Sequence, residues 1–142
     1  MNSAFIAYRQ TGEDPDILGP MLTGVSDEFN RLGIDAYCTF FDIADFQDKS
    51  LGAREIMIHA FETIQNKDFL FVIMTSSAKS DGMIMEVGRF FGVKPIIVAK
   101  HQSVDGTYIP DMADVVYEWS SQEELIGGIA DVIKKIEEMQ KA

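Results

Sequence analysis

The sequence predicts an α/β protein: one domain over residues 1–142, built on a doubly wound parallel sheet of five strands, in the Rossmann or flavodoxin-like class. Two observations lead to this prediction. Apolar runs of strand length alternate with segments of helical periodicity, which is typical of parallel strands joined by helical crossovers. In addition, every residue of Phe69–Met74 is apolar, as expected for a strand that helices cover on both faces.

The first half of the chain predicts two strands and two helices. Apolar positions at spacings of three and four mark the first helix, with Asp16 as its candidate N-cap and Gly33 at its end. Aromatic residues are frequent in the second strand, and the polar stretch after it is expected to be irregular. In chain order, we expect a strand at 4–8, a helix at 16–32, a strand at 34–41, an irregular stretch at 42–50 and a helix at 51–66.

The second half of the chain predicts three strands and two helices. Gly92 marks the end of one helix, and Ser120 or Ser121 is expected to cap the last one. In chain order, we expect a strand at 69–74, a polar loop at 75–81, a helix to about residue 91, a strand at 95–99, a loop at 100–114, a strand at 115–119 and a final helix.

This order of elements is expected to give a sheet with strand order 2-1-3-4-5. Ligands of such sheets bind beyond the carboxyl ends of the strands, where the strand order reverses. Here that crevice lies between strands 1 and 3. The loops Arg9–Asp14 and Thr75–Glu86 border it, and both are polar and rich in small residues. We therefore expect a functional site in these two loops.

Composition excludes several classes of function. The net charge of −11 disfavours binding to the nucleic-acid backbone, which needs a basic face, but is compatible with a small anionic ligand. Cys38 is the single cysteine, so neither an internal disulfide nor a zinc site is expected, and no metal or cofactor is predicted. The chain shows no apolar run of membrane-spanning length and no signal peptide. We therefore expect a cytoplasmic protein without a membrane or nucleic-acid partner.

The loop at 75–81, together with the start of the helix that follows it, has features of an anion site. Free amides in a first helical turn favour an anion, Ser80 can add a hydroxyl donor, and Gly82 allows close approach. The alternative is that Ser80 or Asp81 merely caps the helix. Glu86 follows among apolar residues, where a carboxylate is costly unless it is paired or used. The alternative there is an ordinary surface glutamate.

A resemblance to a known family rests on five spaced residues of this segment. They are Ser80, Gly82, Glu86, Gly88 and Arg89, in the pattern Ser-x-Gly-x-x-x-Glu-x-Gly-Arg. This pattern resembles the signature of the nucleoside 2-deoxyribosyltransferase superfamily, which includes 2′-deoxynucleoside 5′-phosphate N-hydrolases and CMP N-glycosidases. The resemblance covers most of the chain, since it extends to Phe5–Arg9, Asp68 and Lys94–Val98. It implies one nucleoside 2-deoxyribosyltransferase-like domain with a small nucleoside or nucleotide as its partner.

The resemblance implies a catalytic role for Glu86. In the superfamily, the motif glutamate attacks the anomeric carbon of the sugar, displaces the base and forms a covalent glycosyl-enzyme, as in retaining glycosidases. Glu86 would therefore be ionised near neutral pH, helped by helix-start amides and a hydroxyl neighbour. The implied enzyme is an N-glycosidase that cleaves the base–sugar bond of a nucleoside 5′-monophosphate. The alternative is a nucleoside 2-deoxyribosyltransferase, in which a second base takes the sugar.

The phosphate preference comes from position 80. Family members that act on free nucleosides tend to carry aspartate there, whereas those that act on monophosphates tend to carry serine, so Ser80 favours a phosphate. Arg9 is the candidate second phosphate ligand, with a surface arginine as the alternative. Ser77 and Gly82 of the same loop are further candidate substrate contacts.

Aromatic residues are the remaining candidate substrate contacts. Tyr8 or Phe5 fills the place of a tyrosine that the family often has in strand 1, and Tyr8 is expected to touch the substrate. Phe41 and Asp42, after strand 2, are candidates to bracket the base. The alternative is that these aromatics belong to the core.

One departure from the family pattern concerns proton transfer. The family has an acidic residue in the helix before strand 3, and that place falls at Ala60 here, with His59 and Glu62 close by but not equivalent. Loss of such an acid typically costs ~10²–10⁴-fold in rate. A third alternative is therefore a non-catalytic nucleotide-binding or TIR-like signalling module, although TIR-like domains also use a helix-borne glutamate on NAD. The family resemblance further implies a homodimer.

Overall fold

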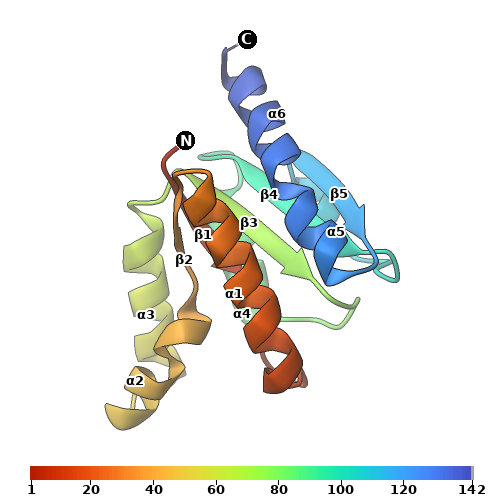
Figure 1. Ribbon diagram of the computed structural model, residues 1–142. Helices are drawn as coiled ribbons and strands as arrows, with labels where there is room; N and C mark the ends of the chain where they lie inside the picture. Colours follow the sequence, from red (N-terminus) through yellow and green to blue (C-terminus); the bar gives the residue numbers. More distant parts are fainter. Residues whose placement is uncertain (142) are drawn as a thin grey trace.

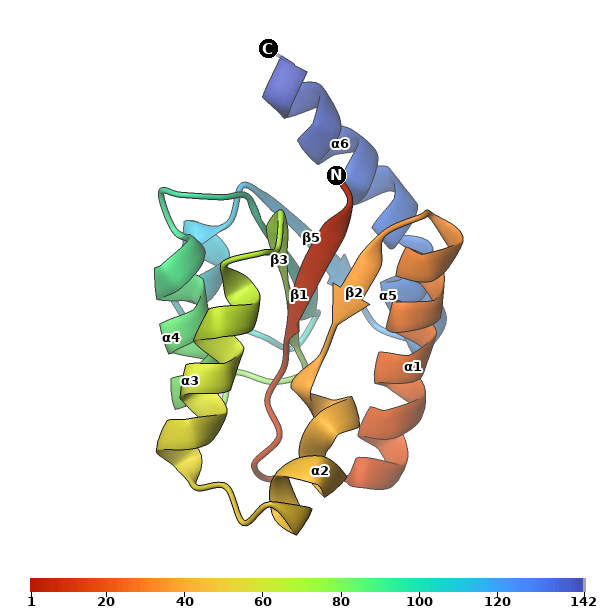
Figure 2. The same ribbon diagram turned by 90° about the vertical axis from the view of Figure 1, so that its left-hand side faces the viewer.

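The computed structural model describes residues 1–141, which form a parallel sheet of five strands with helices on both faces (Figures 1 and 2). The strands lie in the order β2-β1-β3-β4-β5, and every neighbouring pair is parallel. They span Ser3–Ala7 (β1), Asp35–Tyr37 (β2), Phe69–Met74 (β3), Ile96–His101 (β4) and Val115–Trp119 (β5). The predicted doubly wound α/β fold and its strand order are confirmed.

Two groups of helices cover the sheet. Figure 2 shows α1, α5 and α6 on one face, and α3 and α4 on the other. The α-helices span Pro15–Arg31 (α1), Ile43–Asp48 (α2), Ala53–Ile64 (α3), Asp81–Phe90 (α4), Gln122–Gly127 (α5) and Ile129–Lys141 (α6). Two short 3₁₀ helices span Thr39–Asp42 (η1) and Ile109–Met112 (η2). Among residues 1–141, no helix has the length and apolar character that a membrane crossing requires.

Strand β3 supplies side chains to both hydrophobic cores. Its odd-numbered residues pack with α1, α5 and α6, and its even-numbered residues pack with α3 and α4. All six side chains are buried. This is the arrangement that its unbroken apolar sequence predicts, because successive side chains of a strand point to opposite faces.

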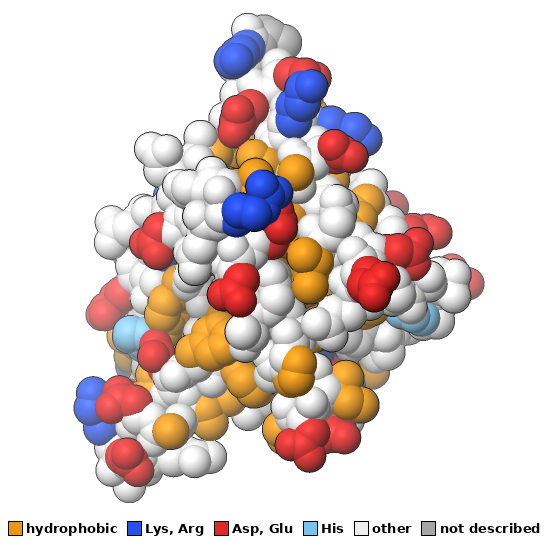
Figure 3. Space-filling view, in the orientation of Figure 1, with side chains coloured by type: hydrophobic (Ala, Val, Ile, Leu, Met, Phe, Trp, Pro, Cys, Tyr) orange, Lys and Arg blue, Asp and Glu red, His pale blue; other side chains and the backbone are white. Residues whose placement is uncertain are grey.

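The surface carries a large excess of acidic groups, with a net charge of −11. On the face formed by α1 and α6, acidic side chains are scattered among apolar and neutral ones (Figure 3). Basic side chains on this face lie mainly toward the end of α6. The acidic excess on this face is therefore spread out rather than gathered into one patch.

Asp68 ties the start of β1 to the start of β3. Its Oδ2 accepts hydrogen bonds from the backbone N–H groups of Asn2 (2.8 Å) and Ser3 (3.1 Å), and its own N–H donates to the Ser3 carbonyl (3.0 Å). The hydrogen bond from Asn2 is the largest cause that lowers the pKa of Asp68. This residue of the family-like pattern therefore holds the two central strands together.

Helix α1 begins before the predicted N-cap. The N-cap is Asp14, whose side chain accepts from the N–H of Asp16 at 2.9 Å, so the prediction of Asp16 as the cap was wrong. Pro15 explains the difference, because proline suits the first helical position: its φ is already helical and its missing N–H has no partner to lose there. The predicted end at Gly33 agrees with its left-handed φ of 76°.

The region after β2 differs most from the prediction. β2 pairs only with Ser3–Phe5 of β1, and beyond Cys38 the chain turns into η1 and then α2. The predicted strand at 34–41 was therefore too long, and the predicted irregular stretch at 42–50 contains a helix. An edge strand has one partner, so little holds it straight, while buried Phe46 anchors α2 to the domain. Ser50, two residues after the end of α2, has a left-handed φ of 54°.

The last predicted helix is in fact two helices. Ser121 caps α5 by accepting from the N–H of Glu124 (3.2 Å), as one of the two predicted caps. α5 ends at Gly127, and at the following residue, Gly128, a Cβ atom would lie 2.5 Å from the ring of Tyr117 on β5. The break between α5 and α6 therefore lies where the backbone passes close to the side chain of Tyr117.

Candidate functional site

Two cavities lie at the carboxyl ends of the strands, against two faces of α4. The inner cavity, of about 200 Å³, occupies the predicted crevice beside β1 and is lined by Tyr8, Gln10, Thr39, Ala60, Ser80 and Glu86 with apolar neighbours. The outer cavity, of about 620 Å³, lies between α4 and the loop after β4. Ser80 and Met83 line both cavities, so the two cavities meet at the N-terminal turn of α4.

Glu86 is a buried carboxyl group that faces the inner cavity. It is 8% exposed and is the one buried polar or charged side chain among residues 1–141. Burial raises the pKa of Glu86 from its ordinary 4.5 to about 8, and desolvation is the cause. The expectation that Glu86 is ionised near neutral pH was therefore wrong for the protein without a ligand. Residues of α3 and of the end of β1 line the cavity beside Glu86 and keep water away from its carboxyl group.

Tyr8 accompanies Glu86 in the inner cavity. Its hydroxyl accepts a hydrogen bond from Thr39 Oγ1 at 3.4 Å, and its ring packs edge-on against Phe40. Burial raises the pKa of Tyr8, and the charge of Glu86 contributes to the shift. Phe5 instead packs on Tyr37 in the other core, with ring centroids 5.6 Å apart. Of the two aromatic candidates, Phe5 on β1 and Tyr8 directly after it, the structure therefore brings Tyr8 to the cavity of Glu86.

Ala60 lines the inner cavity together with Glu86. It lies on α3, at the place where the family pattern would have an acid. His59 turns elsewhere: its Nε2 lies 2.8 Å from the hydroxyl of Tyr37. Glu62 is exposed. Within residues 1–141, Glu86 is thus the sole carboxyl group that lines the inner cavity.

Ser80 is both a cap and a cavity residue. Its Oγ accepts from the N–H of Met83 at 3.3 Å, which confirms the capping alternative for this serine. The hydroxyl hydrogen of a serine that accepts in this way is still available to a ligand. Gly82, in the first turn of α4, lines the inner cavity, and a Cβ atom there would find nothing within 4 Å. Ser80 therefore belongs to the junction between the cavities, and Gly82 to the inner cavity beside it.

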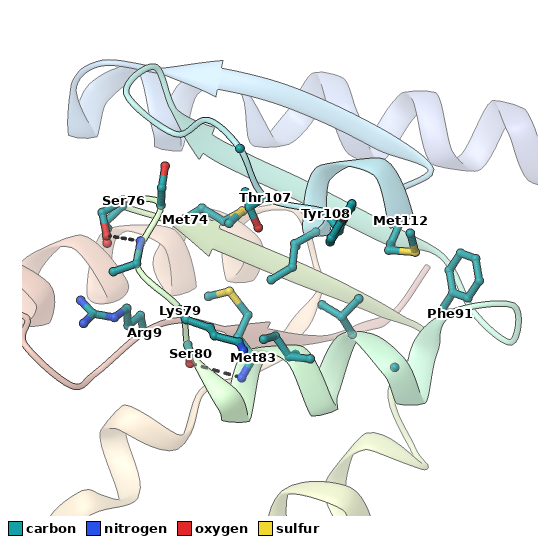
Figure 4. A pocket seen from close by; sticks show the side chains of 18 residues that line it. Arg9, Met74, Ser76, Lys79, Ser80, Met83, Phe91, Thr107, Tyr108 and Met112 are labelled. Atoms are coloured by element: carbon teal, nitrogen blue, oxygen red, sulfur yellow. Dashed lines mark hydrogen bonds between the residues drawn. The ribbon is translucent and has the colours of Figure 1, made fainter.

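The other predicted phosphate contacts line the outer cavity (Figure 4). Arg9 Nη1 lies 3.4 Å from Glu13, and the buried Nε of Arg9 has no hydrogen-bond partner among residues 1–141. Ser77 Oγ accepts from the N–H of Asp105 at 2.8 Å, which joins the loop after β3 to the loop after β4. Lys79 follows at the same end of the cavity. The structure thus brings Ser80, but not Arg9, to the cavity that contains Glu86.

Phe41 and Asp42 lie outside both cavities. Phe41 is half exposed on η1 and packs against Phe40, with ring centroids 5.6 Å apart. Asp42 accepts a hydrogen bond from the hydroxyl of Tyr37 at 2.7 Å. The turn into η1 carries both residues away from Glu86, so the structure does not bring them together with the other candidates.

The two predicted loops supply one side of the outer cavity, through Arg9 and Thr75–Ser80, but its apolar wall was not predicted. Its apolar wall comes from three separate segments: Met74 at the end of β3, Val87 and Phe91 at α4, and Met112 in η2. The sequence of α4 did indicate this wall. A helix that packs on one face needs one apolar stripe, whereas α4 has further apolar residues outside its buried stripe. Within residues 1–141, no group of three or more His, Cys, Asp or Glu side chains could hold a metal ion.

Comparisons with known proteins bear on the fold. Neither a protein-family model nor a curated protein sequence matches the chain. Among solved structures, a conserved protein from Enterococcus faecalis V583 is similar, with a TM-score of 0.64 and 12% identity over 93% of this chain and 99% of that one. The lysine decarboxylase LdcF of Francisella novicida is similar with a TM-score of 0.54 and 12% identity; the match covers 95% of this chain and 17% of LdcF. At these identities, the likenesses show the fold alone.

Proposed function

We propose that this protein is an N-glycosidase that cleaves the base–sugar bond of a nucleoside 5′-monophosphate through a covalent bond to Glu86. The observation that carries the proposal is the position of Glu86: a buried carboxyl group lines a cavity at the strand-order reversal, beside the N-terminus of α4. A buried carboxyl group without a charged partner is costly to keep, and such groups cluster at functional sites. The family-like spacing of Ser80, Gly82 and Glu86 supports the same reaction.

The proposed reaction has two steps. A carboxylate oxygen of Glu86 bonds to the anomeric carbon, and the bond from that carbon to the base nitrogen breaks, with its electron pair leaving on the base. Water then attacks the same carbon and the bond to Glu86 breaks, which returns the electron pair to the carboxylate. The water proton leaves to solvent or to the departed base. The products are the free base and the sugar phosphate.

The junction between the cavities supplies the phosphate contacts of this proposal. The first-turn amides of α4 and the Ser80 hydroxyl would bind the phosphate, because a helix N-terminus favours an anion. Arg9, in the neighbouring outer cavity, would add a charged donor. Its guanidinium is only weakly engaged by Glu13 at 3.4 Å, which leaves donors for a ligand.

A substrate panel tests the proposal. Ribo- and deoxyribonucleoside monophosphates should release free base, and Glu86→Gln, which keeps the shape of the side chain, should lower kcat by at least ~10³-fold. Glu62→Gln is the control, since Glu62 is an exposed carboxylate outside the inner cavity. An unchanged rate in Glu86→Gln would contradict the mechanism. An added second base that becomes a new nucleoside would indicate transfer rather than hydrolysis.

Ala60 favours a second candidate function, a nucleotide-binding module that does not cleave its ligand. The inner cavity offers no second carboxyl group to protonate a departing base, among the residues that the structure describes. This candidate predicts that calorimetry detects nucleotide binding while no base is released. Phosphate-dependent binding that Ser80→Asp abolishes would place such a ligand at the same junction.

A further inference from the structure

We propose that the outer cavity is a binding site in its own right, for a small carboxylate that carries an apolar chain. The carboxylate group would lie at the end of the cavity near Ser80, and the chain would extend along the apolar wall beside α4. This inference goes beyond the proposed function, because it gives no role to Glu86 and requires no cleavage of a nucleotide. It is carried by the charge, the hydrogen-bond donors and the apolar wall of the cavity.

The outer cavity has a positive end in an acidic protein. About one residue in six of the chain is acidic, yet none of the 18 described residues that line this cavity is Asp or Glu. Arg9 and Lys79 lie at the end near Ser80 (Figure 4). The ion pair of Arg9 with Glu13, at 3.4 Å, offsets part of this charge, whereas Lys79 has no ion-pair partner within residues 1–141. The single negative charge of a carboxylate ligand would balance the cation that is left.

The same end of the cavity carries hydroxyl groups that are ready to donate. Three serines line it, and each Oγ accepts a backbone N–H group: Ser76, Ser77 and Ser80, at 3.2, 2.8 and 3.3 Å. A serine oxygen that accepts in this way still has its hydroxyl hydrogen to donate. Among residues 1–141, none of these three hydroxyl groups donates to another group. The oxygens of a carboxylate would supply the acceptors, whereas an ammonium group would not.

The opposite end of the cavity is apolar and incompletely covered. Phe91 and Met112 lie there, away from Arg9 and Lys79 (Figure 4). Three large apolar side chains of the lining remain exposed to water: Ile84 (41%), Phe91 (56%) and Tyr108 (83%). Exposed apolar side chains that gather around one cavity, rather than being scattered singly, mark a binding site. A ligand held near Ser80 by its charge would cover this end with an apolar chain.

The volume of the outer cavity favours a small molecule over a protein partner. It measures about 620 Å³, within the roughly 300–1,000 Å³ that is usual for small-molecule sites. A protein surface laid over the opening would cover Tyr108 but leave the space within unfilled. Three methionines of the lining, Met74, Met83 and Met112, are flexible enough to pack around a chain of methylene groups.

The inner cavity does not suit the same ligand. Within residues 1–141, its lining contains Glu86 but no Lys, Arg or His. A carboxylate ligand in the inner cavity would meet another carboxyl group and find no cation to balance its charge. The two cavities therefore meet at Ser80 but differ in the ligands that they favour.

Calorimetry with simple probes tests this inference. Octanoate should bind at least about tenfold more tightly than butyrate, because each buried CH₂ group tightens binding about fourfold. Octylammonium has the same chain with the opposite charge, and it should bind about tenfold more weakly than octanoate, since it would be repelled at the positive end. Equal binding of octanoate and butyrate, or of octanoate and octylammonium, would overturn the inference.

Two pairs of variants locate the bound chain and its charge. Gly88→Trp should weaken octanoate binding at least tenfold and Gly88→Ala should not, because Gly88 lines the outer cavity and a Cβ atom there meets nothing within 4 Å. Lys79→Glu should weaken octanoate binding at least threefold and strengthen octylammonium binding. Lys134→Glu, on exposed α6, makes the same change in net charge on the other face of the sheet and is the matched control. Equal octanoate binding by the wild type, Gly88→Trp and Lys79→Glu would overturn the inference.

The outcomes also separate this inference from the proposed function. Glu86→Gln should bind octanoate with an unchanged Kd, because Glu86 lines the inner cavity and not the outer one. Loss of octanoate binding in Glu86→Gln would overturn the inference, whereas the N-glycosidase proposal stands or falls on base release alone. If octanoate does not bind and Gly88→Trp converts a dimer to a monomer in size-exclusion chromatography, a second copy of the chain occupies this wall, and the inference is likewise overturned.

Discussion

Glu86 is the residue whose behaviour depends most on its surroundings. In the unfolded chain its pKa is the ordinary 4.5, and in the fold burial raises it to about 8. At pH values between these two pKa values, the unfolded chain has lost the proton of Glu86 whereas the folded protein keeps it. The free energy of unfolding therefore falls as pH rises from 4.5 to 8, and it is constant in this respect outside that window.

The first prediction uses this difference in stability. Glu86→Gln removes the titration, so the variant should match the wild type at pH 4 and exceed its free energy of unfolding above pH 8. The difference is at most about 5 kcal/mol, since each pKa unit corresponds to ~1.4 kcal/mol. Urea unfolding at both pH values measures it. A variant that is less stable than the wild type at pH 9 would contradict burial of a neutral carboxyl group.

The second prediction concerns the pH dependence of activity. A nucleophilic Glu86 must be ionised, so kcat/KM should rise about tenfold per pH unit and level off near the pKa of about 8. The rates of base release between pH 5 and 9 provide the profile. If kcat/KM falls above pH 8, Glu86 acts as a proton donor and not as the nucleophile.

The third prediction separates the two roles of Ser80. Ser80→Asp should retain the cap of α4, since aspartate caps as well as serine, and leave stability within about 0.5 kcal/mol. The added charge should lower kcat/KM for monophosphates at least ~10-fold by repulsion, and not for free nucleosides. Ser80→Ala is the comparison, with an expected loss of about 1 kcal/mol in stability. Equal use of monophosphates by Ser80→Asp and the wild type would show that phosphate binds elsewhere.

At the scale of the elements, Gly127 at the end of α5 and Gly128 after it give the fourth prediction. Gly128→Ala should destabilise the protein by about 1–3 kcal/mol, because the new methyl group would lie 2.5 Å from the ring of Tyr117 on β5. Gly127→Ala is the matched control: a Cβ atom there meets nothing within 4 Å, so stability should be equal or higher. Thermal unfolding of both variants measures the difference. If both lose stability equally, the contact with Tyr117 is not the cause.

The predicted elements were most accurate where the pattern was long and regular. Phe69–Met74 and the strand order follow from apolar runs and from the alternation of strands and helices, and both are observed. The α2 segment was missed because one buried side chain, Phe46, anchors it, and one apolar residue gives no periodicity. β2 was predicted too long because the aromatic residues after Tyr37 belong to η1, where Phe40 packs against Phe41. The sequence alone does not show such contacts.

The candidate site was predictable in part for a similar reason. Loop position and spacing bring Ser80 and Glu86 to one cavity, since both belong to one helix start at the strand-order reversal. The raised pKa of Glu86 was not predictable, because it depends on α3 and β1 closing over the carboxyl group. Arg9 was assigned to the same group but lies in the outer cavity, since side-chain direction at a strand end depends on the loop that follows.

At the scale of the whole molecule, the order of the strands determines which parts of the chain depend on each other. β1 lies between β2, the next strand along the chain, and β3, which is more than sixty residues later. Asp68 holds β1 and β3 together where both strands start. The inner cavity is also built from both parts of the chain, since Tyr8 and Thr39 come from the first part and Ser80 and Glu86 from the second.

Because β1 pairs with β3 across the sheet, the chain can be cut between them into two fragments that still share a sheet interface. Ser50, in the exposed turn before α3, separates a β-α-β fragment that ends there from a fragment with the remaining three strands. The fifth prediction is that the two fragments, produced together, reassociate along β1 and β3 and elute as one complex in size-exclusion chromatography. Neither fragment can line the inner cavity alone, so base release would require both. Failure to associate would mean that the covalent turn, and not the β1–β3 pair, holds the halves together. A functional pair would make the domain a split reporter, whose signal depends on two partners bringing its halves together.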